Sequence, residues 1–265
     1  MSKQFIENKL GHKIEYNPKA KGFRYHVDGQ RKKSVTTAID AYIKLDLTKW
    51  VKRLRDEAMK EVMLKRKVPL DKINSFIDEV ANKAQKEEDW AKNIGTQLHE
   101  WIDLFLKGKK PSIPSTQPLK RMATNFIEFW KEQKFKVIES EMPLYSKRFD
   151  LCGTNDVIVT KDEWNGELGV LDWKTSKDYN FNHILQIEAY RRFIEETTEF
   201  KVPRLAIVNI PKEVGKDITM YEVPKDRTKQ QVYFKSFRAM RYLANVESKF
   251  RKDISKWKKE NKTNV

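Results

Sequence analysis

The sequence predicts an α/β or α+β core with a helical N-terminal portion. Two observations lead to this fold class. Helical apolar spacing dominates before residue 135, whereas three strand-like segments, a helix and two more strand-like segments follow over residues 135–224. The chain has 265 residues, enough for one large core, and no stretch is typical of a linker between independent domains. We therefore expect a single domain over residues 1–265.

The N-terminal portion, residues 1–134, begins with alternating apolar and polar residues. The turn sequences "NPKAKG" and "DG" interrupt this alternation over residues 12–36, which predicts a small hairpin. Ser34 can cap a helix from Val35 to about Lys44, because its hydroxyl can accept from a free N–H group of the first turn.

Two longer helical segments complete this portion. From Leu47 to about Lys107 the apolar spacing is helical, with Pro69 and Gly95 as the candidate break points. After a loop rich in Pro and Ser, a further helix is expected from Leu119 to Lys134, because its apolar residues recur every three or four positions.

Residues 135–225 form the predicted core. Strands are expected over 135–146, 149–160 and 167–176, then a helix over 182–197 and strands over 204–211 and 217–224. The last portion, residues 226–265, contains a helix from about Thr228 to Lys259 with a strongly basic end. A basic run of this kind is either a solvated helix face or a non-specific DNA anchor.

The charge balance indicates a polyanionic partner. Lys and Arg number 54 against 38 Asp and Glu, a formal net charge of +16, and phosphate contacts supply most non-specific affinity for nucleic acid. An anionic membrane is the competing partner, but no lipidation motif or apolar run of ~20 residues supports it. Without an apolar signal region at the N-terminus, we expect a cytoplasmic protein of a bacterial or phage-infected cell, with no membrane association.

Cys152 is the single cysteine of the chain. A disulfide framework, a cysteine-based zinc site and a four-cysteine iron–sulfur cluster are therefore excluded within one chain.

The segment "GVLDWKTSK", residues 169–177, ends an apolar strand on a carboxylate and an ammonium. Asp172 and Lys174 point to the same face of a strand, and Trp173 points to the other. Such a pair is either a surface ion pair contributing ~0–1 kcal/mol or a metal-binding carboxylate beside a lysine that handles water or phosphate.

A second carboxylate lies in the preceding strand. Asp156 stands within an apolar run after Gly153, where an unpaired charge is costly. If the two strands form a hairpin, Asp156 and Asp172 lie close together, and a divalent cation would relieve their repulsion. The alternative for Asp156 is a capping or turn role.

Three further side chains are candidates for the same site. Gln186 and Tyr190 are i and i+4 on the following helix and share one face, either overhanging the strand end or simply completing an amphipathic helix. His99 lies on an earlier helix among apolar residues, where a histidine is either a ligand or a satisfied core residue.

The order of these motifs resembles a known family. "GTQLHEWID", "GTNDVIV", "LDWKTSK" and "QIEAY" occur in the order of the RecB-like branch of the PD-(D/E)xK nuclease superfamily, and the resemblance spans residues 34–192. The segment "SVTTAIDAYIKLDLTKW" is also similar to the entry segment of phage exonucleases and of the mitochondrial genome-maintenance exonuclease. The resemblance implies a restriction-endonuclease-like core, with a mixed central sheet flanked by helices.

The resemblance also implies a metal site. Asp156 and Asp172 would ligate Mg²⁺ or Mn²⁺, with the backbone carbonyl of Trp173 and the imidazole of His99 as further ligands. Several relatives with this histidine carry a four-cysteine iron–sulfur cluster, which this chain cannot form. Some relatives place an acidic residue before the central aspartate. Glu139 or Glu141 could be that residue here, but both are expected to be ordinary strand residues.

The same resemblance implies the remaining roles. Lys174 would position or help deprotonate the attacking water, and Gln186 and Tyr190 would contact the scissile strand. The implied activity is a metal-dependent DNA exonuclease that hydrolyses phosphodiester bonds of single-stranded DNA or DNA ends, in recombination, repair or genome processing. The alternatives are a structure-specific or restriction-type endonuclease on the same core and a catalytically silent nucleic-acid-binding protein.

Overall fold

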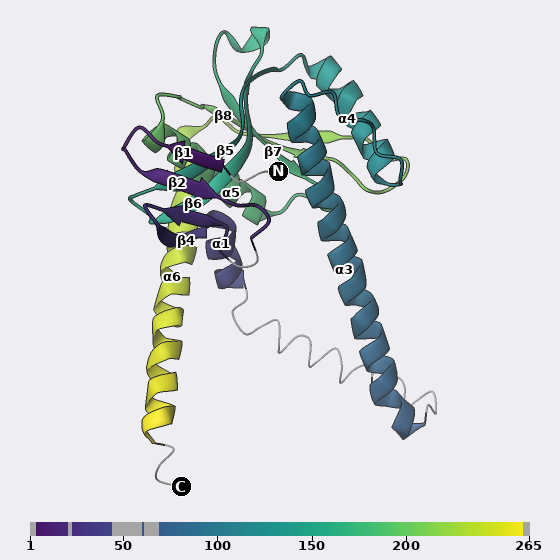
Figure 1. Cartoon of the computed structure of the whole chain (residues 1–265), viewed down its shortest axis with the longest axis vertical. Helices are drawn as coiled ribbons and strands as arrows, with labels where there is room; N and C mark the ends of the chain where they lie inside the picture. Colours follow the sequence, from purple (N-terminus) through teal and green to yellow (C-terminus); the bar gives the residue numbers. More distant parts are fainter. Residues whose placement is uncertain (1–3, 21–22, 44–59, 61–68, 262–265) are drawn as a thin grey trace. The chain divides into compact units, whose positions relative to one another are not determined.

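The structure is a computed structural model that describes residues 4–20, 23–43, 60 and 69–261 (Figure 1). The chain divides into two compact units, one formed by residues 1–42 with 98–265 and the other by residues 43–97. The single domain expected from the sequence stays a prediction. Every described strand belongs to the larger unit, which also contains all the predicted site residues.

The described strands form one nine-stranded mixed sheet. Its order is β1-β2-β3-β4-β6-β7-β8-β9, and β5 pairs with β6 beside this path. Helices pack on it, so the predicted α/β fold with a mixed central sheet flanked by helices is confirmed. The bounds of the strands are Gln4–Glu7 (β1), Lys13–Tyr16 (β2), Tyr25–Val27 (β3), Gln30–Ser34 (β4), Lys136–Ser146 (β5), Leu151–Thr160 (β6), Gly169–Lys174 (β7), Arg204–Asn209 (β8) and Thr219–Val223 (β9).

The N-terminal strands form an antiparallel meander rather than the predicted small hairpin, which was wrong in extent. In the described part of the "NPKAKG" segment, the N–H of Ala20 donates to the carbonyl of Asn17 at 3.2 Å. Asp28 and Gly29 of the "DG" turn have φ values of 49° and 79°, the left-handed conformation that tight hairpin turns require. The sequence did not predict β1, which lies before the segment expected to form the hairpin. The last strand of the meander, β4, pairs in parallel with β6 and so joins this sheet to the core.

The core follows the predicted order. β5, β6 and β7 form an antiparallel meander with a short 3₁₀ turn, Asp162–Trp164, between the last two. The helix α5, Phe181–Thr197, then crosses over to β8, which lies parallel to β7, and β9 returns antiparallel to β8. The parallel pair places the carboxyl ends of β7 and β8 at the same edge of the sheet.

The helices confirm most of the expected bounds. α1 covers Val35–Ile43, and the Ser34 hydroxyl accepts from the N–H of Thr37 at 3.0 Å, as predicted for a cap. α4 covers Leu119–Gln133 and α6 covers Arg227–Glu260.

The helix α3, Leu70–Leu106, begins directly after Pro69. The predicted break at Gly95 is wrong, because one glycine costs a helix interior only about 1 kcal/mol and the surrounding apolar repeat is long. Residues 44–59 and 61–68 of the predicted helical segment lie outside the described residues. None of the described helices has the length and apolar character needed to cross a membrane.

The two faces of the sheet are covered by different helices. Trp173 packs against Phe126 and Trp130 of α4, with ring centroids 5.3 Å and 6.3 Å apart. On the other face, α5, α6 and α1 bury the main apolar cluster. Asp172 and Lys174 alternate with Trp173 and therefore face α5, as the sequence predicted.

Candidate metal-binding and catalytic site

Three carboxylates lie in one row across three strands. The register of β5 and β6 places Glu141 opposite Asp156, and the register of β6 and β7 places Asp172 opposite Asp156 on its other side. Asp172 is almost fully buried, at 1% exposure. Adjacent strands lie only about 5 Å apart, so three acidic groups share a space in which their charges repel.

The imidazole of His99 completes a group that can hold a metal ion. His99 lies near the end of α3, and its Nδ1 is 3.4 Å from Oδ1 of Asp156. Ligand atoms of His99, Glu141 and Asp156 all lie within 4.8 Å of one another. Two carboxylates and one imidazole suit Mn²⁺ or Mg²⁺, so the residues present fit the expected cation.

The sequence leaves Glu141 open between an ordinary strand residue and a further acidic site residue. The structure places its carboxylate with the ligand atoms of His99 and Asp156, which favours the second alternative, and its role as a metal ligand stays a prediction. Its side chain is buried at 6% exposure, and its carboxylate makes no hydrogen bond or ion pair with another described residue. Burial, followed by the charge of Asp156, raises the pKa of Glu141 to about 8. Its φ of 50° is left-handed, a backbone irregularity within β5 that the amino-acid pattern does not reveal.

The electrostatics differ along the carboxylate row. Burial would raise the pKa of Asp156, but His99 and Lys174 outweigh burial and lower it. Conversely, burial would lower the pKa of His99, and the charge of Asp156 raises it. Burial raises the pKa of Asp172 to about 6, with Lys174 opposing the shift and Asp156 adding to it. The raised pKa values of Glu141 and Asp172 show that the metal-free row resists carrying three negative charges, and a divalent cation bound there would favour the ionised carboxylates.

Hydrogen bonds connect the DWK strand to α5. Lys174 Nζ contacts Oδ2 of Asp172 and donates to Oε1 of Gln186 at 3.3 Å. Gln186 Nε2 donates in turn to the hydroxyl of Tyr190 at 3.0 Å. The pair at i and i+4 thus shares the face of α5 that overhangs Lys174.

Gly153 makes room for this arrangement. A Cβ atom built on Gly153 would collide with Cε1 of the Tyr190 ring. Tyr190 is buried at 4% exposure, and burial raises the pKa of its phenol well above the ordinary value. Its hydroxyl therefore stays protonated and can act only as a neutral hydrogen-bonding group near neutral pH.

The structure brings six of the predicted side chains into two adjacent sets. His99 contacts Asp156, and Asp172, Lys174, Gln186 and Tyr190 form a continuous series of contacts. The two sets meet where Asp156 binds the backbone of the DWK strand. For Trp173 the structure shows a different contact, since the backbone N–H donates to Oδ2 of Asp156 at 2.7 Å. The Trp173 carbonyl as a ligand stays a prediction. So do the chemical roles of the other residues.

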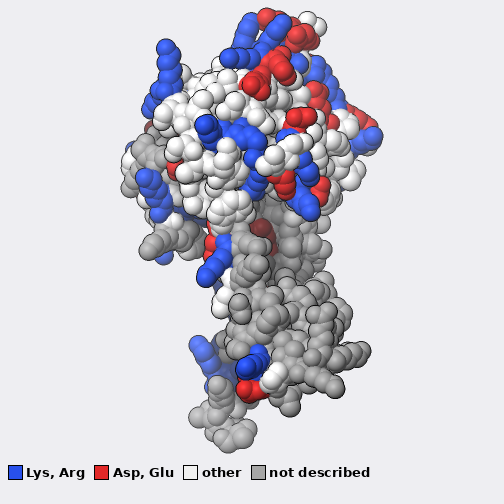
Figure 2. Space-filling view, turned by 90° about the vertical axis from the view of Figure 1, so that its right-hand side faces the viewer, with Lys and Arg blue, Asp and Glu red and all other residues white. Residues whose placement is uncertain are grey.

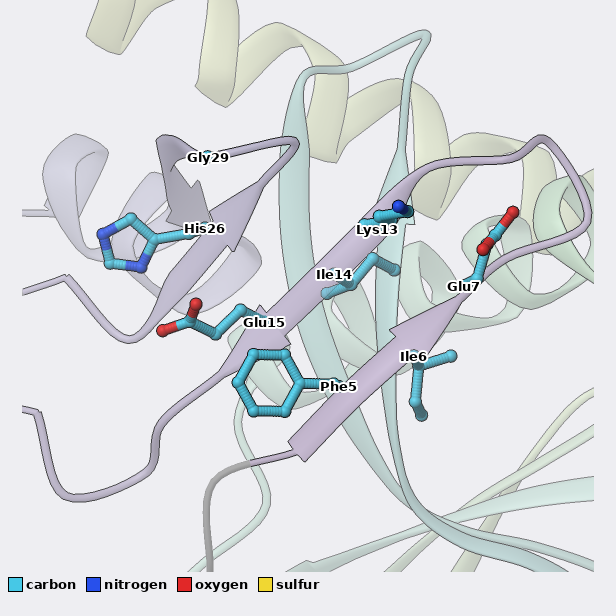
Figure 3. Close-up of a pocket in the computed structure, with 8 residues that line it drawn as sticks. All are labelled: Phe5, Ile6, Glu7, Lys13, Ile14, Glu15, His26 and Gly29. Carbon is cyan, nitrogen blue, oxygen red and sulfur yellow. The ribbon is translucent and has the colours of Figure 1, made fainter.

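A hollow of about 380 Å³ lies elsewhere, on the N-terminal meander (Figure 3). Its lining comes from β1, β2, β3 and the turn after them, and consists of Phe5, Ile6, Glu7, Lys13, Ile14, Glu15, His26 and Gly29. No predicted site residue lines it, so it is separate from the carboxylate row.

No protein-family model and no curated protein matches this sequence. Among solved structures, the chain is similar to the crystal structure of a protein of Eubacterium rectale described as a candidate exonuclease. The identity is 12% and the TM-score 0.38, over 58% of this chain and 68% of the other. A likeness this distant carries no argument about the reaction, which has to be argued from the site itself.

Proposed function

We propose that the protein is a Mg²⁺- or Mn²⁺-dependent deoxyribonuclease that acts as an exonuclease on single-stranded DNA or DNA ends. The observation that carries this proposal is the row of Glu141, Asp156 and Asp172, flanked by His99 on one side and by Lys174 on the other. A metal ligand set can supply the cation that activates water and neutralises phosphate charge, and the hydrogen-bonded lysine beside it can position that water or the phosphate.

The acidic residues and His99 would hold the cation. When bound, a divalent cation lowers the pKa of a coordinated water and neutralises charge that develops on the phosphate. Glu141 must lose a proton to serve as a ligand, because its pKa in the free protein is about 8. Its carboxylate faces the other ligands without a competing partner among the described residues, which makes it available.

Lys174 is the group that would handle water or phosphate. Its ammonium lies between the Asp172 carboxylate and the Gln186 amide, so its position is fixed from the sheet and from α5 together. Gln186 and Tyr190 would extend this fixed surface toward the scissile strand. Burial and the nearby Lys174 lower the pKa of His183, also on α5, to about 4, so it is neutral and is not a competing cation near neutral pH.

The net charge of +16 supports a polyanionic substrate. Figure 2 shows Lys and Arg side chains standing beside Asp and Glu side chains over the described part of the face drawn. Lys and Arg contacts to phosphates would bind the DNA backbone without reading its sequence.

Cleavage of linear and circular DNA tests the proposal. End-labelled linear single- and double-stranded DNA and a circular single strand would each be incubated with Mg²⁺, Mn²⁺ or EDTA, with Lys174→Ala as control. We expect metal-dependent loss of the linear substrates only, and none with the variant. Cutting of the circle would support an endonuclease instead. Tight binding without cleavage in either metal would refute the enzyme and support a silent nucleic-acid-binding protein.

A further inference from the structure

One buried amide beside Lys174 has no role in the site described above. Asn209 is the last residue of β8 and is paired in register with Lys174, the last residue of β7. Residues paired across neighbouring strands project to the same face, so Asn209 shares the face of Asp172 and Lys174. In open α/β sheets this edge, at the carboxyl ends of parallel strands, is where ligands bind.

The Oδ1 atom of Asn209 is a buried acceptor. The side chain is 8% exposed, and none of the residues that the structure describes donates a hydrogen bond to Oδ1. The backbone on which it stands is fixed, because the N–H of Ile210 donates to the carbonyl of Lys174 at 2.7 Å. A buried acceptor without a donor is costly. We therefore expect Oδ1 of Asn209 to receive a hydrogen bond in another state of the protein.

Lys174 is the donor that can change partners. An ammonium has three N–H donors, and here it contacts one oxygen of Asp172 and one of Gln186. A cation held by the carboxylate row would repel the ammonium and draw the charge of Asp172 toward itself. The lysine would then need neutral acceptors close to its present position.

We propose that Asn209 is a positioning residue that accepts a hydrogen bond from Lys174 when a divalent cation is bound at Asp172. This inference rests on the cation site of the proposed function. Gln186 from α5 and Asn209 from β8 then hold the ammonium away from the cation without adding a charge. A carboxylate at residue 209 would attract the cation itself, whereas an amide oxygen competes much less.

The test measures cation binding and needs no cleavage. Mn²⁺ affinity of the full chain, free of DNA, would be measured by titration calorimetry for the wild type, Asn209→Leu, Lys174→Ala and the double variant. We expect Asn209→Leu to weaken Mn²⁺ binding about tenfold. Without the Asn209 acceptor, the Lys174 ammonium stays paired with the Asp172 carboxylate and competes with the cation for it. In the Lys174→Ala background the same substitution should change the affinity less than about twofold.

An equal loss of affinity in both backgrounds would overturn the proposal, because Asn209 would then act on folding or packing and not through Lys174. An unchanged affinity in Asn209→Leu would overturn it as well. If Asn209→Leu does not melt cooperatively in EDTA, Asn209→Ala replaces it in both the wild-type and the Lys174→Ala backgrounds. Asn209→Ser, which keeps an acceptor, should recover part of the lost affinity.

Failure of the proposed function would be recognised separately. A wild-type protein that binds Mn²⁺ but cleaves no DNA would refute the proposed nuclease activity. The role of Asn209 would then still be decided by comparing the Mn²⁺ affinities of the wild type, the two single variants and the double variant. A wild-type protein that binds no Mn²⁺ would overturn both proposals.

Discussion

The two ends of the carboxylate row differ in how well their charges are matched. At the end formed by His99, Glu141 and Asp156, here called the acidic end, the Glu141 carboxylate has no ion pair with a described residue, and burial together with Asp156 raises its pKa to about 8. At the end formed by Asp172, Lys174, Gln186 and Tyr190, here called the paired end, each polar group contacts the next.

This difference shows what the protein supplies by itself. The paired end is held by a continuous series of contacts from β7 to α5, so its geometry does not depend on a ligand. The acidic end concentrates carboxylates whose mutual repulsion the single imidazole does not remove. A divalent cation is the partner that would balance it. Substitutions at the two ends should therefore separate cation binding from turnover.

The largest effect is expected at Asp156, which lies between Glu141 and Asp172 in the carboxylate row. Asp156→Asn keeps an oxygen that can accept from the N–H of Trp173 but removes the central charge of the row. We expect Mn²⁺ binding to be lost and cleavage to fall by at least about 100-fold, because a metal ligand is removed. Titration calorimetry and a cleavage assay measure the two effects.

Asp162→Asn is the matched control for this substitution, because Asp162 is an exposed residue paired with Lys136 outside the site. It should bind Mn²⁺ and cleave DNA as the wild type does. Normal Mn²⁺ affinity in Asp156→Asn would show that the row is not the cation site.

A smaller effect is expected at the acidic end, on how the free energy of unfolding depends on pH. The folded protein holds the Glu141 proton up to about pH 8, whereas the ordinary value is 4.5. The folded state therefore binds more protons than the unfolded state between these values, and the stability of the metal-free protein should fall as pH rises through this window. Glu141→Gln removes the titrating group and should flatten this dependence, by an amount on the order of a few kcal/mol.

Urea unfolding in EDTA at pH 5, 6.5 and 8 measures this dependence. Glu139→Gln changes an exposed residue of the same strand and should leave the wild-type dependence intact. The assignment of the raised pKa fails if Glu141→Gln loses stability with pH as steeply as the wild type.

The smallest effect is expected from disturbing the paired end through packing. Gly153→Ala would push the Tyr190 ring away from β6, and Gly169→Ala would set a Cβ atom 2.6 Å from Cζ3 of Trp164, outside the site. Overpacking of this kind costs about 1–3 kcal/mol in both variants. Only Gly153→Ala should lower turnover, by roughly tenfold for a displaced positioning group, with Mn²⁺ affinity unchanged.

Cleavage rates and Mn²⁺ affinities of the two folded variants, measured side by side, decide this prediction. Equal turnover in Gly153→Ala and Gly169→Ala would mean that the Tyr190 position does not matter for the reaction.

Local pattern determined most of the fold and much of the candidate site. Alternation and helical periodicity identified β5, β6, β7, α5 and β8 in the right order, because these signals arise from which face each element buries. Spacing also placed Asp172 with Lys174, and Gln186 with Tyr190, since i, i+2 on a strand and i, i+4 on a helix share a face whatever the fold.

Other features depended on contacts between distant residues and were decided only by the tertiary structure. Glu141 looks like any acidic strand residue until the register of β5 sets it opposite Asp156 and its backbone turns left-handed. No motif or periodicity around Asn209 indicates a site residue. Its place beside Lys174 follows only from the parallel pairing of β7 with β8. Strand register is set by the packing of the whole sheet, so a short stretch of the sequence read by itself does not determine it.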